Sequence, residues 1–149
     1  MTGVQTCDLP ISDTLQRLFG HKFKPGEIEL YAHHSEKIAN RIYANRMGNR
    51  DEASGDGYRF RGSAICQLTG HDNFYHAGKD LGVDFVHNPD LARTPKYAAL
   101  IGGWFWKTHG CNAFADREDW EGLTKRINGG LIGLDQRKSL TKQAFQVLS

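Results

Sequence analysis

The sequence lacks the patterns that mark most cofactor-dependent enzymes. No Gly-rich phosphate loop follows a strand-like segment, and no Gly-x-Ser-x-Gly elbow is present, which argues against nucleotide-binding and serine-hydrolase chemistry. Cysteine and histidine do not cluster at metal-ligand spacing, and the adjacent His33 and His34 would point about 100° apart on a helix. We therefore expect neither a cofactor nor a bound metal.

Signals for membranes and nucleic acids are absent as well. No apolar run approaches the roughly 20 residues of a membrane span, and the N-terminus shows no secretory hydrophobic region. The net charge is only +2, without any tract of five basic residues. Cys7, Cys66 and Cys111 have neither metal nor disulfide spacing, so we interpret them as free thiols of a reducing compartment. We expect a monomer that neither enters membranes nor binds nucleic acid.

What is present is helical periodicity. The 149 residues suit one domain with a real core, and the segments predicted to form helices are 12–19, 27–31, 35–43, 71–77, 95–105, 116–128 and 134–148. The predicted N-caps are Ser12 or Asp13, Ser35 and Asp116, with Pro95 as a first helical residue and Gly129-Gly130 as a helix end. The residues predicted to face the core include Phe74, Tyr75, Leu140 and Val147. The predicted class is all-α, with at most a very short strand or hairpin; Tyr58, Phe60 and Ile65 predict one short strand or an extended segment.

Two segments depart from this pattern. Residues 1–12 have no periodicity and resemble the translation of a sequencing adapter, so we expect a non-native leader with the domain over 13–149; the alternative is a short natural arm. Residues 45–62 are polar and glycine-rich, which predicts a long loop. Long ordered loops in compact domains are more often functional than linking.

Three segments place polar groups among apolar ones. Gln67, Thr69 and Asn73 offer amides and a hydroxyl that both donate and accept, as sugar hydroxyls and N-acetyl groups require; the alternative is a hydrogen-bonded turn. The aromatic residues at 104–106 could stack on a sugar or simply belong to the core. Asn128 precedes two glycines, so it either contacts a ligand or ends a helix.

Together these segments resemble a known family. The strings are Ala-Asn-Arg-Met-Gly-Asn at 44–49, Gly-Asp-Gly-Tyr-Arg-Phe-Arg-Gly at 55–62, Gln-Leu-Thr-Gly at 67–70, Trp-Phe-Trp at 104–106 and Ile-Asn-Gly-Gly-Leu at 127–131. Their order and spacing resemble glycoside hydrolase family 19, which includes chitinases and phage endolysins of the lysozyme-like superfamily. The resemblance covers about Asp13 to Leu140 and is strongest to the bacterial and phage branch. It implies a lysozyme-like helical fold.

The resemblance also implies roles for individual residues. Gln67, Thr69 and Asn73 match groups that line the sugar cleft, where a hydroxyl and an Asn help to position the attacking water. Asn128 matches a residue that contacts the N-acetylated sugar, and Arg137 matches a supporting Arg of the final helix. Tyr58, in the second string, completes the predicted substrate-binding set. The implied partner is a polysaccharide, with peptidoglycan favoured over chitin.

The sequence departs from the family at its catalytic centre. Family members invert configuration with two glutamates roughly 6.5–9.5 Å apart, the first of which follows a His, and both precede the position of Asp13. No His-Glu pair occurs in the chain, so we expect that both glutamates were lost upstream and that this chain is inactive. Asp51, Glu52 and Asp56, in the loop that borders the predicted cleft, are the local carboxylates that could substitute, although carboxylates in a loop are usually only solvated. Ser63, Ala64, Cys66 and Ile132 are further departures.

Three functional hypotheses remain open. The first is a fragment of a hydrolase that cleaves β-1,4 links of N-acetylated glycans, the second a catalytically dead glycan-binding module, and the third a helical structural protein without a ligand. For the first, we expect synthesis in a bacterial cytoplasm from a phage or bacterial gene, and action on the cell wall or after secretion. No signal peptide is present in the sequence.

Overall fold

The computed structural model describes residues 11–148, and these form two compact units, 11–101 and 102–148. Helices account for nearly all of the regular structure described, and one isolated bridge pairs Ser63 with Leu68. The predicted all-α class is confirmed and is consistent with a lysozyme-like fold. Within residues 11–148, no helix is both long and apolar enough to span a bilayer. Residues 1–10 of the expected leader, with Cys7, lie outside the described part, whereas Ile11 and Ser12 lie in the first helix.

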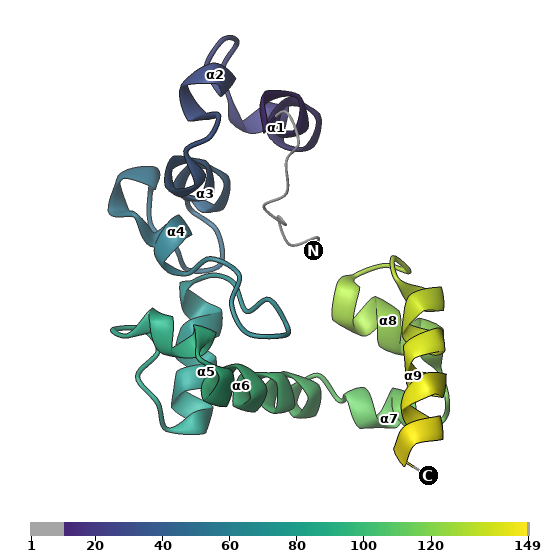
Figure 1. Ribbon diagram of the computed structural model, residues 1–149. Coiled ribbons are helices and arrows are strands. Elements are labelled where there is room, and N and C mark those ends of the chain that lie inside the picture. The colour runs from purple at the N-terminus through teal and green to yellow at the C-terminus, as the bar shows by residue number, and fades with distance from the viewer. Residues whose placement is uncertain (1–10, 149) are drawn as a thin grey trace. The chain divides into compact units, whose positions relative to one another are not determined.

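Figure 1 shows the order of the helices, several of which are joined by long loops or 3-10 turns. The first unit contains α1 (Ile11–Phe19), α2 (Ile28–Tyr31), α3 (Ser35–Tyr43), α4 (Asp56–Arg59) and α5 (His71–Leu81), with the 3-10 helices η1 (Gly20–Lys22), η2 (Glu52–Ser54) and η3 (Pro89–Arg93). Helix α6 (Pro95–Thr108) begins in the first unit and continues into the second. The second unit adds α7 (Cys111–Ala115), α8 (Trp120–Asn128) and α9 (Leu134–Leu148).

Helices α1, α2 and α3 share one small core. Leu15, Ile28 and Ile42 are buried there, with Phe19, Phe23, Ile38 and Tyr43 packed against them. The predicted caps are wrong, because Ser12 and Asp13 lie inside α1, and Ser35 is the first helical residue after His34. Propensity identified the helix starts to within a residue or two, which is the usual accuracy at helix ends.

A second set of apolar side chains forms the core around α5 and the start of α6. Phe60, Phe74, Phe85 and Ile101 are fully or almost fully buried, and Phe60 meets Phe74 edge-on at 5.3 Å between ring centroids. Tyr75 is 50% exposed, so its predicted core position is wrong. Adjacent helical residues point about 100° apart, and burial of Phe74 turns Tyr75 outward.

The predicted loop 45–62 is more ordered than its composition suggested. It contains η2 and the single-turn helix α4, so the predicted strand through Tyr58, Phe60 and Ile65 is wrong. Phe60 N donates to Asp56 O at 2.9 Å, which is a helical hydrogen bond. Close packing explains the turn: a Cβ on Gly57 would lie only 2.4 Å from Ala39 O of α3. The glycine permits an approach that the alternating sequence pattern did not reveal.

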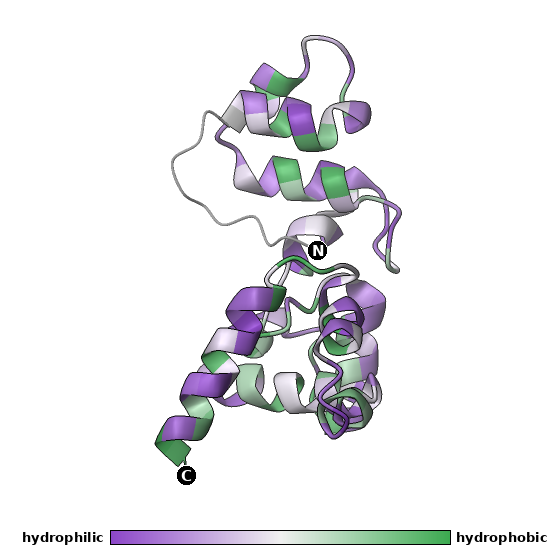
Figure 2. Cartoon of the chain, turned by 90° about the vertical axis from the view of Figure 1, so that its right-hand side faces the viewer, coloured by the Kyte–Doolittle hydropathy of each residue, from purple (hydrophilic) through white to green (hydrophobic). Residues whose placement is uncertain are grey.

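The second unit is built on α8 and α9. The N-cap of α8 is Asp119, whose Oδ1 accepts from Gly122 N at 2.8 Å, so the predicted cap at Asp116 is wrong. Gly129 ends α8 in the left-handed conformation, as predicted. Helix α9 has its predicted bounds, but its apolar residues are not buried: Leu140 is 56% and Val147 84% exposed. Figure 2 shows hydrophobic and hydrophilic residues alternating along this C-terminal helix.

Candidate functional site

A tight turn over residues 63–68 presents the first predicted site residues. Ser63 N donates to Leu68 O at 3.0 Å, and Leu68 N donates to Ser63 O at 2.7 Å. Between them, Ala64 and Gln67 have positive φ angles of 59° and 55°, a conformation that is unfavourable for residues with a Cβ. The two flanking hydrogen bonds hold this unfavourable turn, and with it the position of Gln67.

Gln67 and Thr69 converge over Gly62. A Cβ placed on Gly62 would lie 2.3 Å from Gln67 Oε1 and 3.5 Å from Thr69 Oγ1. The absence of a side chain at this position therefore makes room for both polar groups. The Thr69 hydroxyl donates to Gln67 O at 2.8 Å, which leaves its oxygen able to accept. An amide and a hydroxyl thus lie close together above one glycine.

Asn73 joins this pair from the first turn of α5. Its Nδ2 donates to Thr69 O at 2.7 Å, and within residues 11–148 no hydrogen bond to its Oδ1 is seen. The side chain is exposed, so Oδ1 is available as an acceptor. The structure therefore brings Gln67, Thr69 and Asn73 together, as the sequence predicted. Their contact with a sugar stays a prediction.

One face of the Tyr58 ring is covered by a neighbouring arginine. Arg61 Cζ lies 4.0 Å from the centroid of the Tyr58 ring, and Arg61 Nη1 donates to Tyr58 O at 2.9 Å. The backbone is fixed as well, because Tyr58 N donates to Asn40 Oδ1 at 2.7 Å. A sugar stacked on Tyr58 would therefore use the face opposite Arg61.

Asn128 and Arg137 belong to the second unit. Asn128 Nδ2 donates to Ile132 O at 2.7 Å, and this hydrogen bond closes the turn after α8. Asn128 is the last residue of α8, as expected if its role is to end a helix. Arg137 lies near the start of α9, half-buried, and its Nε is buried without a hydrogen-bond partner among the residues that the structure describes. That all six predicted residues line one cleft stays a prediction.

The loop carboxylates are engaged in structure. Asp56 is 3% exposed and accepts three hydrogen bonds from Arg50, through N at 3.1 Å, Nε at 2.9 Å and Nη2 at 3.1 Å. The hydrogen bonds from the Arg50 side chain lower the pKa of Asp56 to about 2 against the opposing effect of burial. Asp51 Oδ1 accepts from Ser54 N as the cap of η2. These contacts argue against either carboxyl as a substitute proton donor.

Glu52 is held in a similar way. It accepts from the Tyr31 hydroxyl at 2.7 Å and pairs with Arg41, which also pairs with Glu27 and lies over the Tyr31 ring at 5.0 Å. The network joins α2, α3 and η2. Glu52 therefore connects these elements, and each of the three loop carboxylates has a hydrogen-bond or ion-pair partner in the fold.

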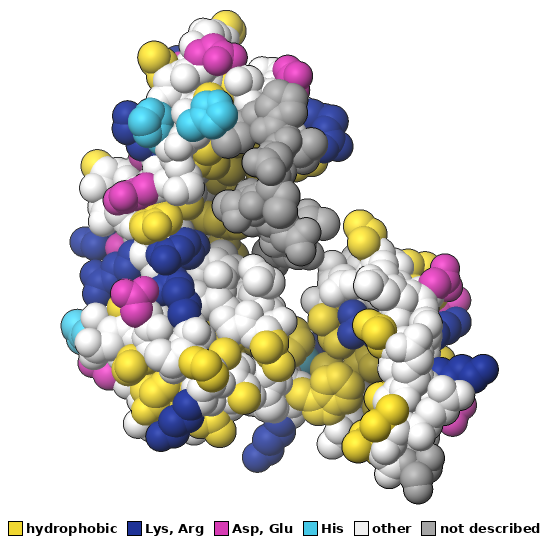
Figure 3. All heavy atoms as spheres, viewed as in Figure 1, with side chains coloured by type: hydrophobic (Ala, Val, Ile, Leu, Met, Phe, Trp, Pro, Cys, Tyr) yellow, Lys and Arg dark blue, Asp and Glu magenta, His cyan; other side chains and the backbone are white. Residues whose placement is uncertain are grey.

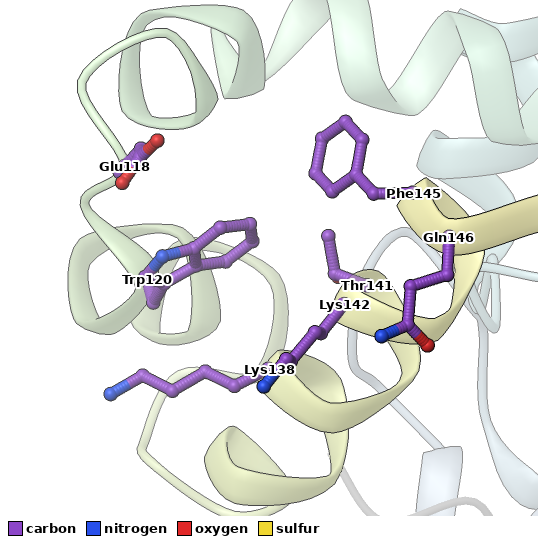
Figure 4. A pocket seen from close by; sticks show the side chains of 7 residues that line it. All are labelled: Glu118, Trp120, Lys138, Thr141, Lys142, Phe145 and Gln146. Atoms are coloured by element: carbon purple, nitrogen blue, oxygen red, sulfur yellow. The ribbon is translucent and has the colours of Figure 1, made fainter. Parts of the chain in front are cut away.

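Each unit also carries a pocket that the sequence did not indicate. The pocket of the second unit, of about 550 Å³, lies between the segment before α8 and helix α9, with Trp120 and Phe145 as its aromatic walls and Lys138, Thr141 and Gln146 beside them (Figure 4). The pocket of the first unit, of about 300 Å³, is lined by Arg50, Asp56, Arg59, Phe60, His71 and His87 among others. Of the six predicted residues, none lines either of these two pockets.

The residues at these pockets were missed because their signal is tertiary. Arg59 lies in the motif that includes Tyr58, but in a chain with a net charge of only +2 and scattered basic residues its charge did not indicate a binding site. Its neighbour His87 follows 28 residues later, and only folding brings them to one pocket. Cys66 and Cys111 are free thiols, as predicted, and burial raises the pKa of each.

Comparison with known proteins agrees with this architecture. The chain is 41% identical over 132 residues to a glycosyl hydrolase family 19 domain-containing protein of Haemophilus influenzae, a match that covers 89% of this chain and 62% of that protein. It is 30% identical over 117 residues to an inactive endochitinase of Arabidopsis thaliana, covering 76% of this chain and 41% of the relative. An endochitinase of the same plant is 32% identical over 98 residues, covering 65% and 34%. No family model matches the chain.

The fold and these relatives define an all-α domain of the glycoside hydrolase type. More narrowly, the chain belongs to glycoside hydrolase family 19. It spans less than two thirds of the length of the relatives named above.

Proposed function

We propose that this chain is the glycan-holding part of a family 19 hydrolase domain, and that its ligand is a polymer of β-1,4-linked N-acetylated sugars. The observation that carries the proposal is the convergence of Gln67 Oε1 and Thr69 Oγ1 over Gly62, with Asn73 bonded to Thr69 O. Amide and hydroxyl groups in this arrangement complement the hydroxyls and N-acetyl amides of such a polymer.

The proposed chemistry of the parent family is inversion by a pair of glutamates, and we propose that this chain does not perform it. Its sequence contains no His-Glu pair. The engagement of Asp51, Glu52 and Asp56 supports the same conclusion, because a carboxylate that is ion-paired or capping a helix is a poor proton donor. Loss of the general acid alone costs about 10²–10⁴ in rate.

The proposed substrate is peptidoglycan in preference to chitin. We propose that the protein is a monomer and that it acts at the bacterial cell wall. The support is the order and spacing of the strings at 44–49, 55–62 and 67–70, which resemble the bacterial and phage branch. The named relatives include both a bacterial protein and plant endochitinases. A direct comparison of the two polymers is therefore part of the test.

Binding is tested by co-sedimentation with insoluble peptidoglycan and with chitin. Asn73→Ala and Gln67→Asn should each reduce retention several-fold; asparagine shortens the amide side chain yet tolerates the left-handed backbone. Lys79→Ala, an exposed change on the same helix α5, serves as the matched control and should bind like the parent. Equal retention of all four proteins would reject the proposed glycan site.

Hydrolysis is tested by the turbidity of outer-membrane-permeabilised bacteria. We expect no clearing above the background of a protein-free sample. Robust clearing would contradict the proposed inactivity, and it would make the loop carboxylates the candidate catalytic groups. A catalytically dead glycan-binding module, the alternative function, would also bind the polymer without clearing the bacteria. The hydrogen bonds and ion pairs of the loop carboxylates support this alternative as well as they support the inactive hydrolase fragment.

A further inference from the structure

The pocket of the first unit is lined by two arginines and two histidines. We call it the basic pocket; it has a volume of about 300 Å³, and Arg50, Arg59, His71 and His87 all contribute to its lining. Figure 3 shows Lys and Arg side chains gathered over the region of α4, with acidic side chains and a histidine beside them. Phe60 and Val86 supply apolar wall between the charged groups.

The charges in this pocket do not cancel. Asp56, the carboxylate in the lining, is fully engaged by the three hydrogen bonds from Arg50, so the two neutralise each other. His71 and His87 each face a neighbouring aspartate, Asp72 at 3.4 Å and Asp84 at 2.8 Å. One guanidinium in the lining, that of Arg59, has no carboxylate within 4.0 Å in the described chain.

Arg59 is nevertheless held in place. Its Nη2 donates to Val86 O at 2.9 Å, and its Cζ lies 5.3 Å from the centroid of the Phe60 ring. Arg93, which pairs with Asp90, donates from Nη2 to Arg59 O at 3.1 Å and fixes the backbone. A guanidinium with one donor engaged by a carbonyl keeps further N–H groups for a ligand. A fixed and unneutralised guanidinium in a pocket is suited to bind an anion.

We propose that the basic pocket binds a carboxylate carried by the glycan strand, with Arg59 as its principal ligand. This inference rests on the proposed glycan function and deepens it, because it names the substituent that separates two substrates. Chitin is uncharged, whereas peptidoglycan carries carboxylates on its stem peptides and, where no peptide is attached, on the lactyl group of its muramoyl sugars. A planar guanidinium matches a carboxylate with parallel hydrogen bonds, and Phe60 and Val86 suit the alkyl part of such a substituent.

The position of the pocket fits this assignment. His71, in its lining, is the first residue of α5 and lies two residues after Thr69 and two before Asn73. The hydrogen bond from His71 N to Asn49 Oδ1 at 2.9 Å fixes the start of this helix. The basic pocket and the polar group over Gly62 thus both contain residues at or next to the start of α5.

Titration calorimetry of the full chain with N-acetylmuramic acid, its methyl ester and N-acetylglucosamine tests the proposal. The acid should bind at least about 10-fold more tightly than the ester or the neutral sugar, because hydrogen bonds between charged groups are the stronger ones. Arg59→Gln should remove this preference, so that the acid, its ester and the neutral sugar bind the variant with similar affinity. Arg46→Gln, an exposed arginine outside the pocket lining, should keep the preference. A stem tripeptide without sugar, measured in parallel, separates a peptide carboxylate from the lactyl carboxylate.

The outcomes separate this inference from the proposed function. Equal affinity of parent and Arg59→Gln for the acid would overturn the carboxylate site, whatever the behaviour of Gln67 and Asn73. Loss of polymer retention in Asn73→Ala with no acid preference in the parent would leave the glycan site intact and reject the basic pocket. Circular dichroism of Arg59→Gln checks the fold, and a chemical-shift change at the Arg59 guanidinium on adding the acid to the parent provides evidence without any substitution.

Discussion

Asn49 Oδ1 accepts a hydrogen bond from His71 N at 2.9 Å, across 22 residues of sequence. The same side chain donates from Nδ2 to Tyr43 O at 3.1 Å. One buried amide, 6% exposed, therefore connects the end of α3 to the start of α5. The loop that carries Gly48 and Arg50 is held by this connection beside the basic pocket.

Replacing Asn49 by Ala should lower the free energy of unfolding by about 2–4 kcal/mol. The substitution leaves Tyr43 O and His71 N, both at half-buried positions, without these partners, and each unsatisfied group costs toward the lower end of about 1–3 kcal/mol. Urea denaturation followed by circular dichroism measures the difference. Asn88→Ala, at an exposed position whose side chain caps nothing, should change stability by less than about 0.5 kcal/mol. A similarly small effect at Asn49 would show that water replaces the amide.

Asp56 should make stability depend on pH in the acid range. Its pKa is about 2 in the folded chain, below the ordinary 3.8, chiefly because of the hydrogen bonds from Arg50. A lowered folded-state pKa contributes stability that is present above 3.8 and is lost as pH falls toward 2. The contribution at pH 7 is about 2 kcal/mol, from the size of the shift.

Thermal unfolding of Asp56→Asn across this range checks the prediction. The variant should be less stable than the parent at pH 7, and the gap should narrow as the pH approaches 2.5. Asp116→Asn, at an exposed carboxyl, is the control and should follow the parent at every pH. A gap that stays constant with pH would mean that the Asp56 charge is not what stabilises the fold.

Gly62→Ala should impair glycan binding while the fold survives. The added methyl group would stand 2.3 Å from Gln67 Oε1, so the end of this flexible side chain must move away from Thr69. We expect several-fold weaker retention on peptidoglycan with a nearly unchanged midpoint of thermal unfolding. Gly103→Ala is the matched control, because its methyl group would meet no atom within 4 Å. As a glycine within helix α6, it should gain about 0.5–1 kcal/mol on substitution. Unchanged retention in Gly62→Ala would remove Gln67 from the site.

Helix placement was largely determined by the sequence. Pro95 begins α6, Gly129 ends α8 and Leu134 begins α9, as predicted. The physical reason is local: proline at a first helical position needs no N–H, and glycine accepts the left-handed conformation of a helix end. The grouping of Gln67, Thr69 and Asn73 was also predictable, because they lie within seven consecutive residues.

Tertiary contacts decided the rest. The backbone at 56–59 forms a helical turn because Asp56 finds Arg50 and Gly57 approaches Ala39, neither of which an alternating pattern reveals. Arg59 became a candidate ligand only because Val86 and His87 fold against it. Local propensity acts within a few residues, whereas pairing of charges and closure of a pocket depend on residues far apart in the chain.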